Sequence, residues 1–195
     1  MIRILCAGDL HLGRRSSRLP EGADGRAHSA TAAWNALVDY AIRERVDMVA
    51  LSGDLVDRAN RYFEAFGPLE RGIRRLGEAH IHVAAVAGNH DFDVLPKLAP
   101  SLGKNFHLLG AGGRWNWATL PRDGKPALHI VGWSFPEEGD GHVPDSPMAG
   151  FPTLPNDGVP VLGLLHADLD QPKSPYAPVR SDELRSRPVS CWLLG

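Results

Sequence analysis

The sequence has little that would tie it to an oxidising or membrane setting. It has two cysteines in 195 residues, Cys6 and Cys191, and both lie in apolar runs, where we expect reduced thiols buried in the core. No apolar run approaches the length of a membrane span, and the stretch before Asp9 is too short for the apolar region of a signal peptide. We therefore expect a cytoplasmic protein without a disulfide framework.

An excess of charge of one sign is also lacking. Lys and Arg number 21 against 23 Asp and Glu, which gives a formal net charge of -2. The whole molecule therefore exerts no general attraction on nucleic acid or on a membrane surface, and an anionic partner must be held by a local feature. What the chain does have is 43% hydrophobic residues, enough for a sizeable core in one domain and too many for a disordered chain.

The first 90 residues alternate between buried strands and amphipathic helices. Apolar runs rich in Val, Ile and Ala predict strands at residues 2–7, 47–51 and 81–87. Apolar residues at helical spacing predict a helix from Trp34 to Ile42, which Ser29 is placed to cap, and another from Phe63 to Leu76, which Gly67 and Pro68 should bend or restart. Such alternation indicates a parallel sheet, in which ligands bind at the carboxyl ends of the strands.

The second half of the sequence is richer in Gly and Pro over part of its length. Of the 37 Gly and Pro residues, 17 fall between residues 110 and 160, so loops dominate that stretch. Three further apolar runs predict strands at residues 127–133, 159–165 and 188–194, and no long helix separates the first two. We infer an α/β fold in which a second sheet packs against the first, with a loop over residues 135–158 projecting at one end.

Polar side chains follow four of the predicted strands. They are Asp9 and His11 after the first, Asp54 after the second, Asn89 after the third, and His166 at the end of VLGLLH. Because the carboxyl ends of parallel strands meet at one rim, these side chains should converge as a mixed oxygen and nitrogen set, which suits a pair of Mn, Fe or Zn ions. Such a pair neutralises phosphate oxygens and activates water, and Asp54 is our candidate for a bridging carboxylate.

Each of these patterns also has an ordinary explanation. An Asp-x-His, a Gly-Asp or a Gly-Asn after a strand is typical of a surface turn, and a histidine that closes an apolar strand is commonly just hydrogen-bonded. Their joint occurrence at four strand ends favours a metal centre over four unrelated turns.

The order of these motifs resembles the calcineurin-type metallophosphoesterase superfamily over nearly the whole chain. The pattern is closer still to bacterial DNA-repair exonucleases of the SbcD type, in DLHLG, SGDLVD, VAGNHD, VGWSFP, LLHADLD and SPYAP. The resemblance implies one metallophosphoesterase domain over residues 1–195, built as a two-sheet sandwich flanked by helices (αββα). It also implies a two-metal phosphodiesterase that acts on DNA.

The resemblance implies a role for each metal ligand. Asp9 and His11 would bind the first ion and Asn89 and His166 the second, with Asp54 bridging them. Mn²⁺ is the ion that we expect first, with Fe or Zn as alternatives.

Three further residues receive roles from the same resemblance. His90, beside the second ion, would stabilise or protonate the leaving oxygen. Related phosphatases with a similar G-D-x-V-D-R pattern use residues matching Asp57 to hold that histidine and Arg58 to grip phosphate. Many nucleases of the family carry another residue at the position of Asp57, and a solvated turn with a surface Asp–Arg pair is the alternative.

Other polar and aromatic residues near these motifs are less specific. Arg14, Arg15 and Arg18 could rim the site and take DNA phosphates, or form an ordinary solvated loop. The alternation of Trp115 and Trp117 favours packing on one strand face over base stacking. We expect the histidines without a motif to be surface or locally bonded, and His142 is the one whose loop could reach the rim. The surface and locally bonded set is His28, His80, His82, His107, His129 and His142.

In the resembling family, the strand that matches CWLLG runs into G-H-x-H, whose two histidines each complete the coordination of one ion. Gly195 matches the glycine of that motif. We therefore expect the sequence to be truncated before this motif and before the capping region of the family. Each ion would then be one imidazole short and would bind weakly or incompletely, so we expect this chain to be a weakly active or inactive form of the metal-dependent phosphoesterase.

Three functions remain open from the sequence. The first is a nuclease subunit acting on DNA, which would pair with a coiled-coil ATPase of the SbcC type and could form a homodimer. The second is a phosphomonoesterase or a small-molecule phosphodiesterase, which Asp57, Arg58 and the nearly neutral charge favour. The third is a non-catalytic DNA-binding or scaffold module.

Overall fold

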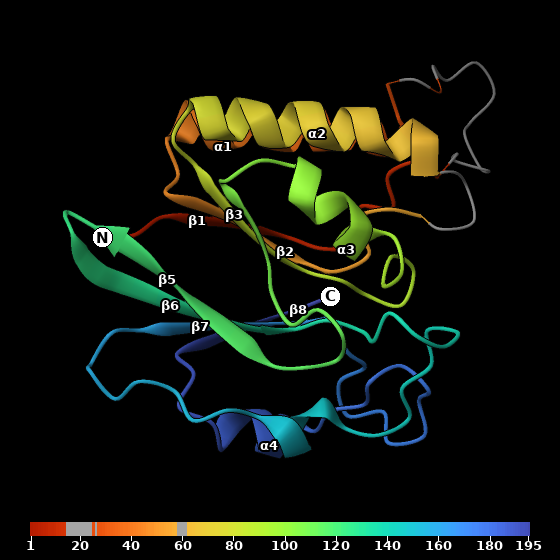
Figure 1. Cartoon of the computed structure of the whole chain (residues 1–195), viewed down its shortest axis with the longest axis vertical. Coiled ribbons are helices and arrows are strands. Elements are labelled where there is room, and N and C mark those ends of the chain that lie inside the picture. The colour runs from red at the N-terminus through yellow and green to blue at the C-terminus, as the bar shows by residue number, and fades with distance from the viewer. Residues whose placement is uncertain (15–24, 26, 58–61) are drawn as a thin grey trace.

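The computed structural model describes residues 1–14, 25, 27–57 and 62–195. Over these residues the chain forms two four-stranded sheets that stack face to face, with helices on the outer faces of both (Figure 1). The predicted α/β architecture of two sheets flanked by helices is confirmed.

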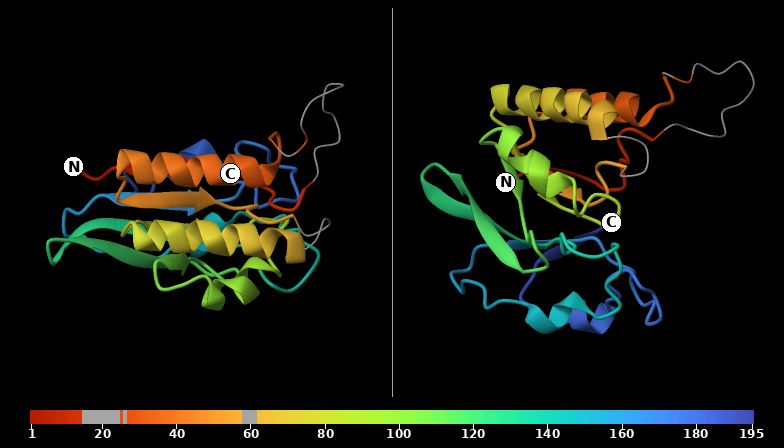
Figure 2. Two further views of the ribbon diagram at one scale, coloured as in Figure 1. Left: turned by 90° about the horizontal axis from the view of Figure 1, so that it is seen from above. Right: turned by 45° about the vertical axis from the view of Figure 1, so that its right-hand side comes forward.

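The first sheet is parallel throughout and has the order β1-β2-β3-β4. Its strands are β1 (Ile4–Ala7), β2 (Met48–Ser52), β3 (His82–Val86) and β4 (Phe106–Leu108). Two long helices lie side by side over its outer face (Figure 2), namely α1 (Ala30–Glu44) and α2 (Tyr62–Glu78). A short helix α3 (Leu95–Leu98) and a 3-10 turn η2 (Ala99–Ser101) lead into β4.

The second sheet has the order β5-β6-β7-β8. Its strands are β5 (Asn116–Arg122), β6 (Lys125–Trp133), β7 (Val161–Leu165) and β8 (Cys191–Leu194). The hairpin partners β5 and β6 are antiparallel, whereas β6, β7 and β8 run parallel to one another. A 3-10 turn η3 (Pro147–Gly150) and the short helix α4 (Ser181–Arg185) lie on its outer side.

Apolar side chains from both sheets meet between them, where β2 faces β7 and β3 faces β6. The buried residues of this layer include Met48, Val86, Ile130, Leu162 and Leu164. Because both sheets are fixed by this layer, the carboxyl ends of β1, β2, β3 and β7 lie at one end of the sandwich. The polar residues that follow those strands therefore share one rim.

The helices follow the predicted spacing. Ser29 caps α1 as expected, since its Oγ accepts a hydrogen bond from the backbone N–H of Ala32 at 3.1 Å. A bend or a restart was expected at Gly67 and Pro68, and the structure excludes the restart, because α2 is one helix that contains Pro68. Its carbonyl oxygen accepts a hydrogen bond at 3.0 Å from the indole N–H of Trp34, which is fully buried on α1. None of the described helices has the length and apolar character needed to cross a membrane.

Both cysteines were expected in the core, and this is wrong: Cys6 and Cys191 are exposed. The reason is their place in the sheets, since β1 and β8 are the edge strands and lack a neighbour on one side. The two tryptophans in and next to β5 also differ in their exposure. Trp115 packs edge-on against Phe151, as packing predicts, whereas Trp117 on the edge strand β5 remains 42% exposed.

The segment between β6 and β7 was expected to project from the molecule, and it does not. Phe135 and Met148 are fully buried under the second sheet, and Gly141 is buried at the rim. The chain connects two parallel strands here without a long helix, as the sequence predicted, but the apolar residues of the segment hold it against the sheet.

A buried carboxylate connects the loops that follow β2 and β3. One oxygen of Asp91 accepts hydrogen bonds from the backbone N–H groups of Leu55 at 2.7 Å and Val56 at 3.3 Å, and the other accepts from Gly88 at 2.7 Å. Complete burial raises the pKa of Asp91 to about 7, with the Asp54 carboxylate adding to the effect and the three N–H donors opposing it. The side chain thus fixes the two loops to each other.

We predict that Gly72→Ala destabilises the protein. A Cβ atom at Gly72 would lie 2.2 Å from the indole nitrogen of Trp34, so α1 and α2 would have to separate. The expected loss is about 1–3 kcal/mol in the free energy of unfolding, measured by urea denaturation. Gly67→Ala on the same helix is the control, because its Cβ would meet only the flexible end of Arg71, and its stability should stay equal or rise by about 1 kcal/mol. Equal effects of the two substitutions would contradict this packing.

We predict that Asp91→Asn also destabilises the protein. Three N–H groups point at the two carboxylate oxygens, and the amide NH₂ cannot accept a hydrogen bond from any of them. At least one buried donor loses its partner, at a cost of about 1–3 kcal/mol in unfolding free energy. The control is Asp123→Asn, since Asp123 is exposed in a left-handed turn that Asn tolerates. If the two variants unfold at the same urea concentration, Asp91 does not have this role.

Candidate metal centre

The loops that follow β1 and β2 run side by side at the rim. Backbone hydrogen bonds join Asp9 N–H to the Gly53 carbonyl at 3.1 Å and His11 N–H to the Asp54 carbonyl at 2.9 Å. Asp9, His11 and Asp54 all have positive φ angles, of 53°, 45° and 52°. Left-handed backbone is uncommon outside glycine and concentrates at functional sites, where the surrounding structure enforces it. These hydrogen bonds enforce it here and turn the three side chains inward.

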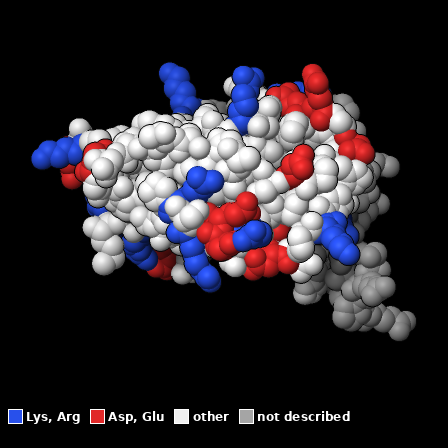
Figure 3. Space-filling model, turned by 90° about the horizontal axis from the view of Figure 1, so that it is seen from below, with Lys and Arg blue, Asp and Glu red and all other residues white. Residues whose placement is uncertain are grey.

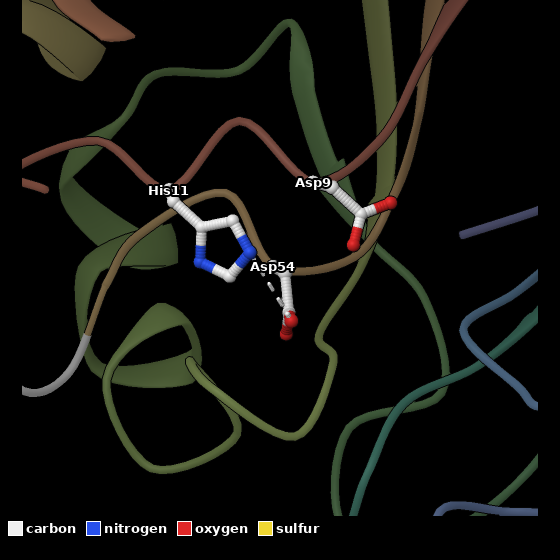
Figure 4. A group of neighbouring side chains, drawn as sticks. All are labelled: Asp9, His11 and Asp54. Carbon is white, nitrogen blue, oxygen red and sulfur yellow. Dashed lines mark ion pairs between the residues drawn. The ribbon is translucent and has the colours of Figure 1, made fainter. Parts of the chain in front are cut away.

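Asp9, His11 and Asp54 form the first group of potential ligands (Figure 4). One ligand atom from each lies within 4.8 Å of the others, and His11 Nε2 is 3.8 Å from Asp54 Oδ2. Burial lowers the pKa of His11 although the Asp54 carboxylate opposes this, so the neutral, metal-binding form of the ring is favoured. Its Nδ1 is buried and has no hydrogen-bond partner among the described residues.

His166 and Asn89 form the second group. The ring of His166, at the end of β7, donates from Nδ1 to the Ser52 carbonyl at 3.0 Å, and this fixes its tautomer. The other nitrogen, Nε2, faces the amide oxygen of Asn89 at 3.1 Å and the Asp54 carboxylate at 3.4 Å. Burial opposes protonation of the His166 ring, but the hydrogen bond and charge of Asp54 outweigh it and raise the pKa of His166. Once Nε2 gives up its proton to make way for a cation, this nitrogen, the Asn89 oxygen and the Asp54 carboxylate each offer a lone pair.

Asp54 belongs to both groups. Its carboxylate is 3% exposed, and its Oδ1 accepts a hydrogen bond from the backbone N–H of His90 at 2.9 Å. Burial opposes its ionisation, but the hydrogen bond and charge of His166 and the His90 N–H outweigh it, so the pKa of Asp54 lies below its ordinary value. Gly88 makes this close approach possible, since a Cβ there would lie 2.2 Å from Asp54 Oδ1.

The residues present fit divalent cations. Carboxylate, imidazole and amide donors converge from four strand ends, and buried lone pairs that face one another are stabilised by a cation between them. The structure brings together all five side chains that the sequence singled out: Asp9, His11, Asp54, Asn89 and His166. Which ion each would hold, and whether Asp54 bridges, stay predictions.

The predicted acid and its partners lie beside the first group. The ring of His90 is exposed and packs edge-on against His11, with 4.9 Å between the ring centroids, and its place beside the second ion stays a prediction. The carboxylate of Asp57 is buried and faces Arg14, with 3.9 Å between Arg14 Nε and Asp57 Oδ2. The orienting role of Asp57 toward His90 stays a prediction. The other predicted phosphate contacts, Arg15, Arg18 and Arg58, lie outside the described residues.

Two positioning contacts were not anticipated from the sequence. The Ser52 carbonyl that orients His166 is a backbone group and has no sequence signal. Ser134, after β6, accepts a hydrogen bond at its Oγ from Ala87 N–H at 2.8 Å and so fixes the second sheet to the loop that carries Asn89. In the sequence, the one signal for this role of Ser134 is its position after an apolar strand, within VGWSFP.

The sequence is similar to curated phosphoesterases and DNA-repair proteins. It is 30% identical over 195 residues to the metallophosphoesterase YhaO of Bacillus subtilis, which covers 97% of this chain and 47% of YhaO. It is 34% identical over 91 residues to the DNA double-strand break repair protein Mre11 of Saccharolobus solfataricus, with 47% of this chain and 23% of that protein covered. The chain thus spans about half, or less, of the length of these relatives.

Solved structures share the fold. The calcineurin-like phosphoesterase YfkN from Bacillus subtilis matches with a TM-score of 0.53 and 13% identity, over 100% of this chain and 71% of that one. The protein TT1561 of Thermus thermophilus matches with a TM-score of 0.52 and 16% identity, over 85% and 68% of the two chains.

A family model described as calcineurin-like phosphoesterase matches residues 2–159, which include four of the five converging side chains. The remaining one, His166, follows the matched range and joins them in space through Asn89 and Asp54. The chain belongs to the calcineurin-like metallophosphoesterase family.

Proposed function

We propose that this chain is the catalytic domain, over residues 1–195, of a two-metal phosphodiesterase that acts on DNA. The observation that carries the proposal is the position of Asp54 between two groups of ligands, 3.8 Å from His11 Nε2 and 3.4 Å from His166 Nε2. A shared carboxylate is what a pair of neighbouring ions requires.

In this proposal Asp9, His11 and Asp54 hold one divalent ion, and Asp54, Asn89 and His166 hold the other. Mn²⁺ is the preferred ion, with Fe or Zn as alternatives. When bound, the ions supply Lewis-acid polarisation of the phosphoryl oxygens and a water of lowered pKa.

The protein groups around the ligands have separate tasks. The Ser52 carbonyl keeps Nε2 of His166 directed inward, and the His90 N–H holds the Asp54 carboxylate. The exposed ring of His90 is the group placed to donate a hydrogen bond or a proton to the leaving oxygen.

DNA as the substrate is supported by the relatives named as DNA double-strand break repair proteins, from organisms that include Saccharolobus solfataricus and Haloferax volcanii. Arg14 adds local support, because it places an exposed cation directly after the first ligand group. From the resemblance to DNA-repair nucleases of the SbcD type, we propose a coiled-coil ATPase of the SbcC type as the protein partner. We also propose that the protein forms a homodimer and acts in the cytoplasm.

A phosphomonoesterase or small-molecule phosphodiesterase is the second candidate, and the charges around the site favour it. Residues 136–145, which pack on the Asn89 loop through Gly141, have four exposed carboxylates and neither Lys nor Arg, the carboxylates being Glu137, Glu138, Asp140 and Asp145. On the outer side of the second sheet, away from the rim, the described Lys and Arg residues are interspersed with Asp and Glu (Figure 3).

We predict that Asp54→Ala weakens both Mn²⁺ binding events by tenfold or more, because its carboxylate would serve both ions. Asn89→Ala should weaken only one of them. The measurement is a titration of each protein with Mn²⁺, in which free ions are counted by electron paramagnetic resonance. Glu78→Ala, on the exposed surface of α2, is the control and should bind as the unchanged protein does. An Asp54→Ala protein that loses one ion and keeps the other would contradict a shared carboxylate.

We predict that the protein with saturating Mn²⁺ releases nucleotides from linear duplex DNA at a low rate, as weakly held ions imply, and that Asp54→Ala lowers this rate by 100-fold or more, as expected for loss of both ion sites. The same preparations are assayed on 4-nitrophenyl phosphate. Rapid hydrolysis of this monoester without nucleotide release from DNA would favour the second candidate. Activity that Asp54→Ala leaves intact would point to a contaminating enzyme.

A further inference from the structure

The segment between β6 and β7 touches the loop that carries Asn89. Gly141 is buried, with a φ of +88°, and a Cβ atom there would lie 2.8 Å from the Asn89 carbonyl oxygen and 3.0 Å from the ring of Phe92. Only glycine fits both the backbone conformation and the space. Because consecutive Cα atoms are about 3.80 Å apart, the next residue, His142, begins one peptide away from a metal-ligand loop.

His142 is held in place on two sides. Its ring nitrogen Nδ1 donates to Asp140 Oδ2 at 2.8 Å, and its backbone N–H donates to Asp140 Oδ1 at 3.0 Å. On the other side its ring lies 5.4 Å from that of Tyr176, tilted by 37°. The backbone of the neighbouring Val143 pairs with the chain around Tyr176, donating to the Pro175 carbonyl at 2.7 Å and accepting from Ala177 N–H at 2.7 Å.

These contacts leave one nitrogen of the ring for a ligand. With Nδ1 engaged by Asp140, only Nε2 is available, and the side chain of His142 is 49% exposed. The hydrogen bond from His142 lowers the pKa of Asp140, so its carboxylate is charged at neutral pH and orients the ring continuously. A carboxylate that orients an imidazole in this way fixes where the second nitrogen points.

The surrounding charges make His142 distinctive. The stretch EEGDGHVPD has four carboxylates, which repel a phosphate, and His142 is its one side chain with an uncharged hydrogen-bonding group: because Nδ1 donates to Asp140, Nε2 of the neutral ring accepts a hydrogen bond. A fixed, uncharged acceptor among acidic neighbours suits a hydroxyl or base N–H group of a nucleoside rather than the phosphates of the DNA backbone.

We propose that His142 is a substrate-binding residue that contacts the nucleotide next to the scissile phosphate, on the side of Asn89. This inference rests on the proposed phosphodiesterase function and adds to it a determinant of specificity for nucleotides. Asp140 and Tyr176 act through His142, as positioning residues for its ring.

The test compares two diesters with the same leaving group, bis(4-nitrophenyl) phosphate and the 4-nitrophenyl ester of thymidine 5′-monophosphate. Only the second has a nucleoside for His142 to contact. His142→Ala should lower the ratio of kcat/KM for the thymidine ester to that for the symmetrical diester by about fivefold, mainly through KM, as expected for one hydrogen bond between uncharged groups. Asp140→Ala should lower this ratio less, and His142→Gln should restore part of it.

His107→Ala is the matched control. His107 is an exposed histidine on β4, where its ring stacks on that of His82, and none of the five predicted metal ligands follows this strand. Its substitution should leave the ratio unchanged.

The outcomes separate this inference from the proposed function. An unchanged ratio in His142→Ala, or an equal loss on both diesters, would overturn the contact with the nucleotide. A protein that cleaves no DNA but shows the lowered ratio would refute DNA as the substrate and support the contact. If neither diester is hydrolysed, binding of thymidine 5′-monophosphate is followed by the imidazole NMR signal that His142→Ala removes, and a signal that does not shift would likewise overturn it.

Discussion

The rim of the sandwich depends on the buried carboxylate of Asp91. It has no exposed surface and joins the loop after β2 to the loop after β3 through three backbone N–H groups. Asp54 and Asn89 lie directly beside these hydrogen bonds in the chain, so Asp91 helps to set their separation, together with the hydrogen bond from the His90 N–H to Asp54. Because burial disfavours its charge, this carboxylate is retained only where several donors compensate for the lost water.

The second sheet contributes to the centre across the interface between the layers. His166 ends β7, yet its orientation comes from a carbonyl of β2, and Ser134 after β6 fixes the loop after β3. The second ligand group therefore depends on hydrogen bonds between the layers as well as within them. The apolar layer around Val86 and Leu164 keeps these bonds short, since displacement of one sheet would lengthen all of them.

The strand-end motifs could be predicted from the sequence because parallel topology sends them to one rim, and the five ligands indeed converge. What failed depends on neighbours that a sequence does not reveal. Cys6 and Cys191 are in apolar runs, but edge strands expose them. The strand β4 has three residues and β5 contains Pro121, so neither shows the clear alternation of apolar and polar residues that predicts a strand. The place of His142 follows from the buried Gly141, which resembles any loop glycine in the sequence.

The connection from β6 to β7 has a consequence for how the specificity of such a protein can change. Parallel strands are usually joined through a helix whose packing restricts its sequence, whereas here an irregular segment joins them and borders the ligand loops. Its apolar anchors, Phe135 and Met148, hold it in place, and the residues between them face solvent at many positions. Insertions or exchanges in that interval can remodel what the rim accepts while the strand ends that carry the chemistry remain intact.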